Sequence, residues 1–153
     1  FSMTGNRADP ADVAVPSVTT AAWQKPVPVN KTNTQFSMHG ATPVLHKANL
    51  VLGNEVVWKD YANSAQQTRI VNRTITGSIS IEATALATKD WYAAHRDAIL
   101  GALQIEHGIV AGNIVQVDAT DVQITSIKPE DADGIQVLTM DILVTGGLTL
   151  TFL

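Results

Sequence analysis

From Phe36 onward, the chain alternates apolar and polar residues in short runs that are typical of β-strands. One such run is Thr74–Glu82, which would place its three isoleucines and Gly77 on one face of a strand and its polar residues on the other. Later runs are rich in valine, isoleucine and threonine: Leu103–His107, Ile114–Asp118, Val122–Ile127, Ile135–Thr145 and Leu148–Phe152. The pattern predicts a mainly β domain whose strands each have one buried and one solvated face.

Dipeptides that favour tight turns separate these runs. Gly53-Asn54 follows the apolar run Ala48–Leu52 and precedes Val56–Trp58, so we expect a hairpin with a two-residue turn there. Similar signals recur where a hairpin would need positive φ angles: Gly112-Asn113, Asp133-Gly134 and Gly146-Gly147. Most neighbouring strands are therefore expected to pair antiparallel, in a β-sandwich or barrel.

One stretch has helical periodicity, and we expect a helix over about residues 88–100. The Thr88 hydroxyl is placed to cap its first turn, and Asp90 would complement the positive end of the helix dipole. Gly101 stands where a left-handed C-terminal cap is expected. The three- and four-residue spacing gathers one face that should pack onto the sheet: Trp91, Ala94, His95, Ala98 and Ile99.

The N-terminal segment differs from the rest. Residues 4–35 contain four prolines and many threonines, asparagines and alanines, without a sustained period. We therefore divide the chain into residues 1–35, the end of a strand followed by an extended proline-rich arm, and residues 36–153, the β-domain with its helix. Such an arm is either a linker or a segment that contacts another molecule. Within it, Trp23 is expected to anchor in a partner's groove, whereas Trp58 and Trp91 are expected in the core.

Length and charge narrow the classes of function. The 153 residues suit one domain, and only 16% of them are charged, which suits a surface that packs against copies of itself. A net charge of −4, with ten scattered basic residues, argues against a nucleic-acid reader. The chain has no cysteine and no apolar run long enough to span a bilayer, so we expect neither disulfides nor membrane insertion. Its start at Phe1 rather than at methionine suggests a fragment or a processed product.

The sequence shows no catalytic or metal-binding motif, and we expect neither an enzyme nor a bound cofactor or metal. The acidic run Glu130–Gly134 resembles a shortened calcium loop but lacks ligands at its end, so an acidic hairpin turn is the simpler interpretation. The four histidines are too far apart in the sequence to form a metal pair: His39, His46, His95 and His107.

Two other classes of function stay open. A carbohydrate-binding or adhesion β-sandwich would use the three tryptophans as an aromatic platform. A hydrolase would need a dispersed pair of carboxylates facing one pocket, for instance among Glu106, Asp118 and Asp121.

A series of runs resembles the tail tube proteins, or major tail proteins, of long-tailed bacteriophages. No single run is diagnostic, but together they cover nearly the whole chain in the family's order: Trp23–Asn30, Asn33–Gly40, Leu50–Lys59, Arg73, Gly77–Ala83, Ala87–Trp91, His107-Gly108 and Ala111–Val115. Phe1–Gly5 resembles the end of a preceding strand in that family, so the chain is similar to the C-terminal part of such a protein.

The resemblance implies a structural subunit of the virion tail, assembled in the cytoplasm of the host bacterium. It implies hexameric rings that stack into a tube, which encloses the tape measure protein and later passes DNA without sequence-specific binding. A tail terminator would be a further partner. We expect the arm to contact a neighbouring subunit through Trp23, Pro26, Pro28 and Asn30.

Overall fold

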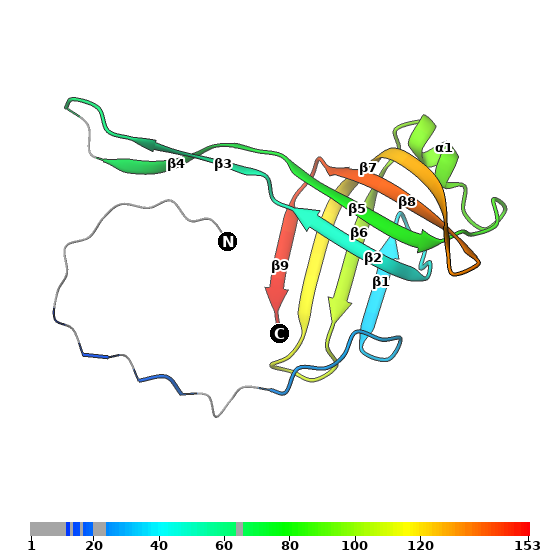
Figure 1. The fold of residues 1–153 in the computed structure, drawn as a ribbon, viewed down its shortest axis with the longest axis horizontal. Helices are drawn as coiled ribbons and strands as arrows, with labels where there is room; N and C mark the ends of the chain where they lie inside the picture. Colours follow the sequence, from blue (N-terminus) through cyan, green and yellow to red (C-terminus); the bar gives the residue numbers. More distant parts are fainter. Residues whose placement is uncertain (1–11, 13, 16, 20–23, 64–65) are drawn as a thin grey trace.

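The computed structural model describes residues 12, 14–15, 17–19, 24–63 and 66–153. This part of the chain is mostly β-structure with one short helix, so the predicted mainly β, antiparallel fold is confirmed (Figure 1). The elements follow in chain order: β1 (Thr34–Met38), β2 (Leu45–Val51), β3 (Asn54–Lys59), β4 (Gln67–Arg73), β5 (Ile75–Glu82), α1 (Trp91–Arg96), β6 (Leu100–His107), β7 (Val115–Ala132), β8 (Ile135–Val144) and β9 (Leu148–Phe152).

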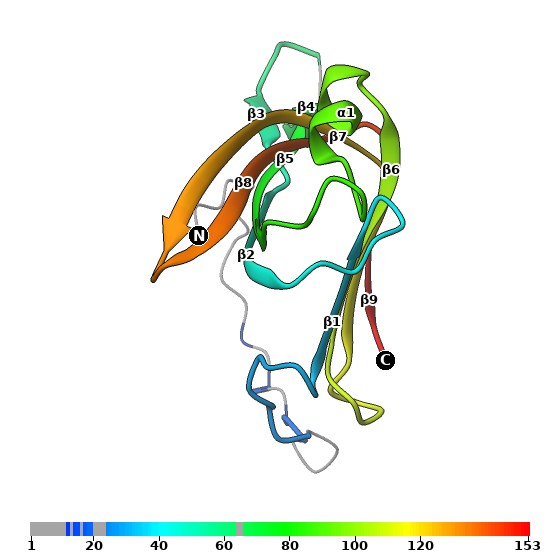
Figure 2. The same cartoon turned by 90° about the vertical axis from the view of Figure 1, so that its right-hand side faces the viewer.

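One seven-stranded antiparallel sheet forms most of the molecule, in the order β1-β6-β7-β8-β5-β2, with β9 also paired to β7. The 18-residue β7 is strongly curved (Figure 2). Its first part lies in one layer with β1, β6 and β9, and its second part lies in the other layer with β8, β5 and β2 (Figure 2). The two layers expected of a sandwich are therefore parts of a single curled sheet that shares β7.

Strands β8 and β9 follow one another along the same side of β7. β8 pairs with Val122–Ala132, and β9 pairs with Val115–Ala119. The expected hairpin at Gly146-Gly147 is therefore wrong: the chain keeps its direction, and neither glycine has a positive φ. Because both strands find their hydrogen-bond partners on β7, the double glycine only breaks the strand at the bend.

Close contact with neighbouring side chains explains the first glycine at this bend. The Asp121 carbonyl accepts hydrogen bonds from the amides of Thr145 and Gly146, at 2.9 and 3.2 Å. A Cβ on Gly146 would meet the side chains of Thr120 and Asp121, whereas one on Gly147 would meet nothing within 4 Å. Gly146 therefore allows β8 and β9 both to remain hydrogen-bonded to β7 at the point where β7 passes from one layer to the other.

The core lies between the two layers. The predicted inner face of Thr74–Glu82 is confirmed, since Ile79 and Ile81 are fully buried and Ile75 packs against the same cluster. Large side chains from both layers and from the helix fill the centre: Met38, Trp91, Leu103, Ile124, Met140 and Ile142. Alternation along the strands thus identified the buried face correctly.

A long β-ribbon replaces the hairpin expected at Gly53-Asn54. β2 pairs with β5 and β3 pairs with β4, so the chain passes from β2 into β3 without reversing. Gly53 does have a positive φ, of 56°, and a Cβ there would collide with the Thr74 carbonyl. The predicted two-residue hairpin is wrong because this glycine serves a junction in the ribbon, where the Thr74 amide donates to the Gly53 carbonyl at 3.4 Å.

Helix α1 is shorter than predicted. Asp90, not Thr88, is its N-cap: the Asp90 carboxylate accepts a hydrogen bond from the Ala93 amide at 2.8 Å. The helix ends before Ala98, which has a φ of 50°, and Leu100 already belongs to β6. The predicted extension to Leu100 and the cap at Gly101 are wrong because this segment pairs with β7 instead.

The inner face of the helix is partly as expected. Trp91 and Ala94 are buried, and His95 is half-buried with its Nδ1 3.0 Å from the Ile124 carbonyl oxygen. Ala98 and Ile99 are exposed beyond the helix end. No helix among the described residues is long and apolar enough to cross a membrane.

Candidate functional site

Four strands form a layer with two open sides. We call β1, β6, residues Val115–Ala119 of β7 and β9 the four-stranded layer. Each neighbouring pair is antiparallel, so strand directions alternate and β9 runs antiparallel to β1. Among the described strands, β1 pairs with β6 alone and β9 with β7 alone. The layer therefore ends in two strand edges on opposite sides (Figure 1).

The free edge of β9 offers both hydrogen-bonding groups and apolar side chains. Leu153 and Ile114 exchange backbone hydrogen bonds of 3.0 and 3.1 Å. Bonded and non-bonded pairs alternate in an antiparallel ladder. The backbone N–H and C=O groups of every second residue therefore face the free edge: Leu148, Leu150 and Phe152. The side chains of Leu150 and Phe152 are 56% and 71% exposed.

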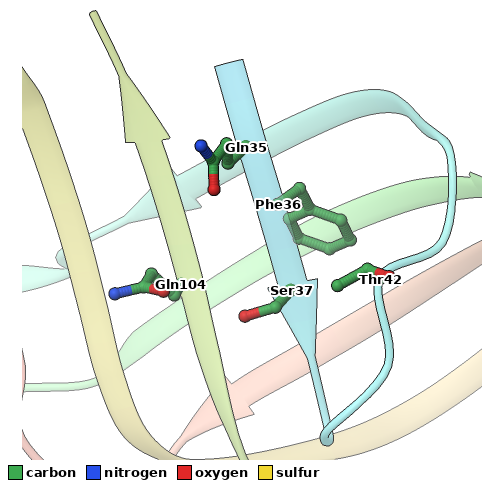
Figure 3. A pocket seen from close by; sticks show the side chains of 5 residues that line it. All are labelled: Gln35, Phe36, Ser37, Thr42 and Gln104. Atoms are coloured by element: carbon green, nitrogen blue, oxygen red, sulfur yellow. The ribbon is translucent and has the colours of Figure 1, made fainter. Parts of the chain in front are cut away.

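The free edge of β1 is shorter. Thr34 and Met38 use backbone groups in the turns on either side of the strand. Asn33 and His39 bond to the β6 side, so by the same alternation the N–H and C=O of Phe36 face away from β6. A recess of about 380 Å³ runs along this strand (Figure 3), lined by Gln35, Phe36, Ser37, Thr42 and Gln104.

The two faces of the four-stranded layer differ in polarity. The face toward the core carries apolar rows, such as Met38, Leu103, Ala119 and Leu148. The opposite face, which we call the outer face, carries two rows of polar side chains: Ser37, Gln104, Asp118, Thr149, and Gln35, Glu106, Gln116, Thr151. These rows contain two carboxylates and neither lysine nor arginine.

The β3–β4 hairpin is a second exposed feature. It forms a two-stranded sheet of its own and reaches away from the body of the molecule (Figure 1). Val56, Trp58 and Ile70 are between 43% and 53% exposed. The prediction that Trp58 lies in the core is wrong, because its strand leaves the body. The same prediction for Trp91, which is 1% exposed, is confirmed.

Comparison with known proteins shows which fold this is. No protein-family model matches the chain, and no curated protein is similar to it in sequence. The sheath/tube terminator of an extracellular contractile injection system (PVC) has a TM-score of 0.61 at 8% identity, covering 82% of this chain and 97% of that one. The SPP1 tail tube gives 0.59 at 10%, covering 82% and 80%. The tail of an empty gene transfer agent particle, solved with C6 symmetry, gives 0.53 at 17%, covering 81% and 99%.

The chain has the tail-tube fold. Three independent assemblies share it, and each match spans most of both chains. The resemblance first seen in the sequence is confirmed at the level of this fold.

In this tail-tube fold, the segment of residues 24–33 lies against one end of the four-stranded layer. The Val27 carbonyl oxygen lies 3.2 Å from His107 Nε2, and Lys25 accepts a 3.4 Å hydrogen bond from the side-chain amide of Asn113. The Asn30 carboxamide accepts hydrogen bonds from two following amides, both at 3.0 Å, and shapes the turn before β1. The segment is thus attached to the domain before β1 begins.

The predicted arm residues lie on this segment or just before it. Pro26 and Pro28 are exposed, Asn30 is exposed within the turn, and Trp23 lies outside the described residues. One subunit does not show what these side chains meet in an assembly, so their inter-subunit role stays a prediction.

The other predicted turns are mostly correct in the tail-tube fold. Gly112, with a φ of 93°, and Asn113 lie between β6 and β7, and the Asn113 carboxamide accepts from the Val110 amide at 3.1 Å. Asp133 and Gly134, with φ angles of 54° and 83°, join β7 to β8. Glycine and a short polar residue supply these angles at little cost. Asn54 instead opens β3, where its side chain accepts from Arg73 Nε at 2.7 Å.

Of the three candidate carboxylates of a hydrolase, two share one face of the sheet, and none of the three lines the recess along β1. Glu106 and Asp118 stand on the outer face, where Gln104 donates to Asp118 at 2.9 Å, while Asp121 lies at the bend of β7. In the described ranges, no group of three or more His, Cys, Asp or Glu residues could hold a metal ion. Of the acidic run Glu130–Gly134, the first three residues end β7 and the last two form the turn to β8, where Asp131 accepts from the Gly134 amide at 3.2 Å.

Sequence reasoning missed the role of His39. The ring is buried in the turn after β1, with Nε2 2.9 Å from the Val122 carbonyl oxygen, and Lys89 Nζ donates to the His39 carbonyl at 2.7 Å. Burial lowers the pKa of His39 below its ordinary value of 6.5; the hydrogen bond to Val122 opposes this, and the Lys89 charge adds to the lowering. The ring lies against Gly101, where a Cβ would collide with it, so the packing of His39 requires a glycine at this position.

Proposed function

We propose that this chain is a structural, non-enzymatic subunit of a phage tail tube, which joins copies of itself into closed rings through the free edges of β1 and β9. The observation that carries the proposal is the alternation of strand direction across the four-stranded layer. Because β9 runs antiparallel to β1, the β9 edge of one copy can pair with the β1 edge of the next and continue one antiparallel sheet. The two edges are different surfaces, so repetition of the contact closes a ring when the rotation between copies adds up to a full turn, and neither of these two edges is then exposed.

The outer face of the four-stranded layer would then line the channel, since the other face packs against the core. Its two carboxylates, without basic side chains, suit a conduit that passes DNA without binding it. We propose hexameric rings that stack into the tube of a virion tail, built in the host cytoplasm around a tape measure protein and ended by a tail terminator. The C6 symmetry of a gene transfer agent tail of the same fold supports six subunits.

A ring-forming tube terminator is the second candidate. The likeness to the PVC sheath/tube terminator favours it, because that match has a TM-score of 0.61. Both candidates need the same ring contact, and they differ in whether rings stack. The carbohydrate-binding alternative has less support, because Trp91 is buried and Trp58 stands on the hairpin, so these two do not share one platform.

Electron microscopy of the purified full chain, as a function of concentration, tests the proposal. A tube subunit gives long tubes with a central channel, whereas a terminator gives single rings. A chain that stays monomeric at all concentrations would contradict both.

A pair of variants tests the β9 edge. Leu150→Pro removes an N–H that faces the free edge and leaves the ladder to β7 intact, because Thr149 and Thr151 make those bonds. Leu150→Ala removes most of the side chain and keeps that N–H. We expect Leu150→Pro to abolish rings while its melting transition remains, and Leu150→Ala still to form them. Equal assembly of the two variants would show that this edge is not used.

A further inference from the structure

A tight turn ends β1. His39 and Gly40, with φ angles of 50° and 74°, connect Met38 to Ala41, and the backbones of these two residues exchange hydrogen bonds that are both 2.9 Å long. Gly40 is exposed, and a Cβ on it would meet nothing within 4 Å. We call these two central residues the His39–Gly40 turn.

Three hydrogen bonds of His39 join this turn to other parts of the chain. The His39 amide donates to the Ala102 carbonyl of β6 at 2.8 Å, and the ring Nε2 lies 2.9 Å from the Val122 carbonyl oxygen of β7. The His39 carbonyl accepts from Lys89 Nζ, in the loop before α1, at 2.7 Å. One residue therefore carries these contacts with β6, with β7 and with that loop.

The surroundings of the ring suit its neutral form. Because the Val122 carbonyl can only accept, the hydrogen of the neutral ring is on Nε2. A second proton would go to Nδ1, which lies against Gly101 and has no hydrogen-bond partner in the described part of the chain. The ring is also buried, with its centre 6.4 Å from that of Trp91. A positive charge formed there would be poorly solvated.

Lys89 is the charged group that acts on the ring. Its Nζ binds the His39 carbonyl and lies 5.5 Å from the centre of the Trp91 ring. Its charge is positive and therefore opposes the uptake of a proton by His39, in the same direction as burial. A protonated ring in this position would be repelled as well as desolvated.

The titratable groups on the neighbouring elements do not offset this repulsion. Asp90 accepts an amide hydrogen bond at the start of α1, and the His95 ring lies at the Ile124 carbonyl oxygen. On β7, the Asp121 carboxylate accepts from the Thr120 hydroxyl at 3.1 Å. The contacts that β6 and β7 make with the ring come from uncharged residues.

We propose that the His39–Gly40 turn opens when His39 takes up a proton, and that it leaves β6, β7 and the loop before α1 while the rest of the sheet stays folded. In the open turn the imidazole is solvated and binds a proton readily, whereas the closed turn resists it, so acid shifts the equilibrium toward opening. Because this turn ends β1, acid loosens that side of the four-stranded layer first. The inference concerns a single subunit and does not depend on the proposed function.

Amide hydrogen exchange, followed by NMR for each residue, tests the inference. The reporters are the amides of His39 and Ala41, which the closed turn protects, and those of Ile79 and Met140 in the core. After correction for intrinsic rates, we expect the protection of His39 and Ala41 to fall about threefold or more from pH 7 to pH 5. At both pH values they should exchange through an opening of lower free energy than the one that exposes the core amides.

Variants separate proton uptake from loss of packing. His39→Asn tolerates the φ of 50° and does not titrate, so its protection at positions 39 and 41 should be the same at both pH values. Lys89→Gln keeps a hydrogen-bond donor and removes the charge, so the closed ring protonates more readily and the ratio of protection between pH 7 and pH 5 should shrink. A purely structural role of Lys89 would lower protection equally at both pH values. The matched control is the exposed Lys128→Gln, which should keep the wild-type ratio.

Three results would overturn the inference. The first is equal protection of the wild-type turn at the two pH values, and the second is a wild-type ratio in His39→Asn or Lys89→Gln. The third is exchange of the turn amides at the opening free energy of the core, since the turn would then open only with the whole domain. If His39→Asn does not fold, the comparison of Lys89→Gln with Lys128→Gln still decides.

Discussion

At the scale of single residues, Gly146 is a position where the fold tolerates little change. A Cβ at this position would approach Asp121 Oδ2 to 2.5 Å and meet Thr120 as well, whereas Gly147 beside it has open space. We expect Gly146→Ala to lower the free energy of unfolding by about 1–3 kcal/mol, as overpacking does. Gly147→Ala should stay within about 0.5 kcal/mol of the wild type. Denaturant unfolding measures both free energies, and equal losses in the two variants would contradict the conclusion that close packing requires a glycine at position 146.

His39 gives the molecule a predictable pH dependence. Its folded-state pKa is lowered, so the folded protein favours the neutral ring. The contribution of this group to stability is complete above its unfolded pKa of about 6.5 and is lost as the pH falls through the folded value. His39→Asn keeps a residue that tolerates the φ of 50° and removes the titration. Its free energy of unfolding should therefore fall less between about pH 7 and pH 5 than that of the wild type.

The control is a variant that leaves every histidine in place: Thr88→Ala, at an exposed position, should keep the wild-type slope of unfolding free energy against pH. Parallel curves for the wild type and His39→Asn would show that the buried ring does not titrate differently on folding.

At the scale of elements, helix α1 begins after an N-cap, Asp90, that lies two residues later than the cap predicted from the sequence. Asp90 accepts the Ala93 amide, whereas Thr88 has an exposed side chain. We expect Asp90→Ala to cost about 1 kcal/mol of stability, and Thr88→Ala to stay within about 0.5 kcal/mol of the wild type. Thermal unfolding compares the two, and a larger loss for Thr88→Ala would restore the cap inferred from the sequence.

The elements also show why some predictions succeeded. The inner face of Thr74–Glu82 follows from alternation along one strand, which is local information. The hairpins predicted at Gly53-Asn54 and Gly146-Gly147 are absent because the strands on either side of each turn signal pair with strands farther away in the sequence. β2 pairs with β5, and β9 pairs with the start of β7, so the turn signal between neighbours did not decide the pairing.

At the scale of the whole molecule, the sequence predicted the fold class but not the candidate site. Leu148–Phe152 reads as an ordinary strand, and nothing in its alternation distinguishes an edge strand from a central one. The edge follows from the topology, because β9 finds β7 on one side and no further described strand on the other. The low content of charged residues and the resemblance to tail tube proteins suggested association, but the sequence pointed to the arm rather than to this edge.

The position of β8 in the sheet has a consequence for how the protein is made. β8 is the strand that joins β5 and β2 to β7, and it is the eighth of the nine described strands in chain order. While the ribosome is still adding residues before Ile135, the nascent chain has two groups of strands without the strand that hydrogen-bonds them together. Folding of the sheet therefore finishes late in translation, and the open edges of both groups are what a chaperone would have to shield until then.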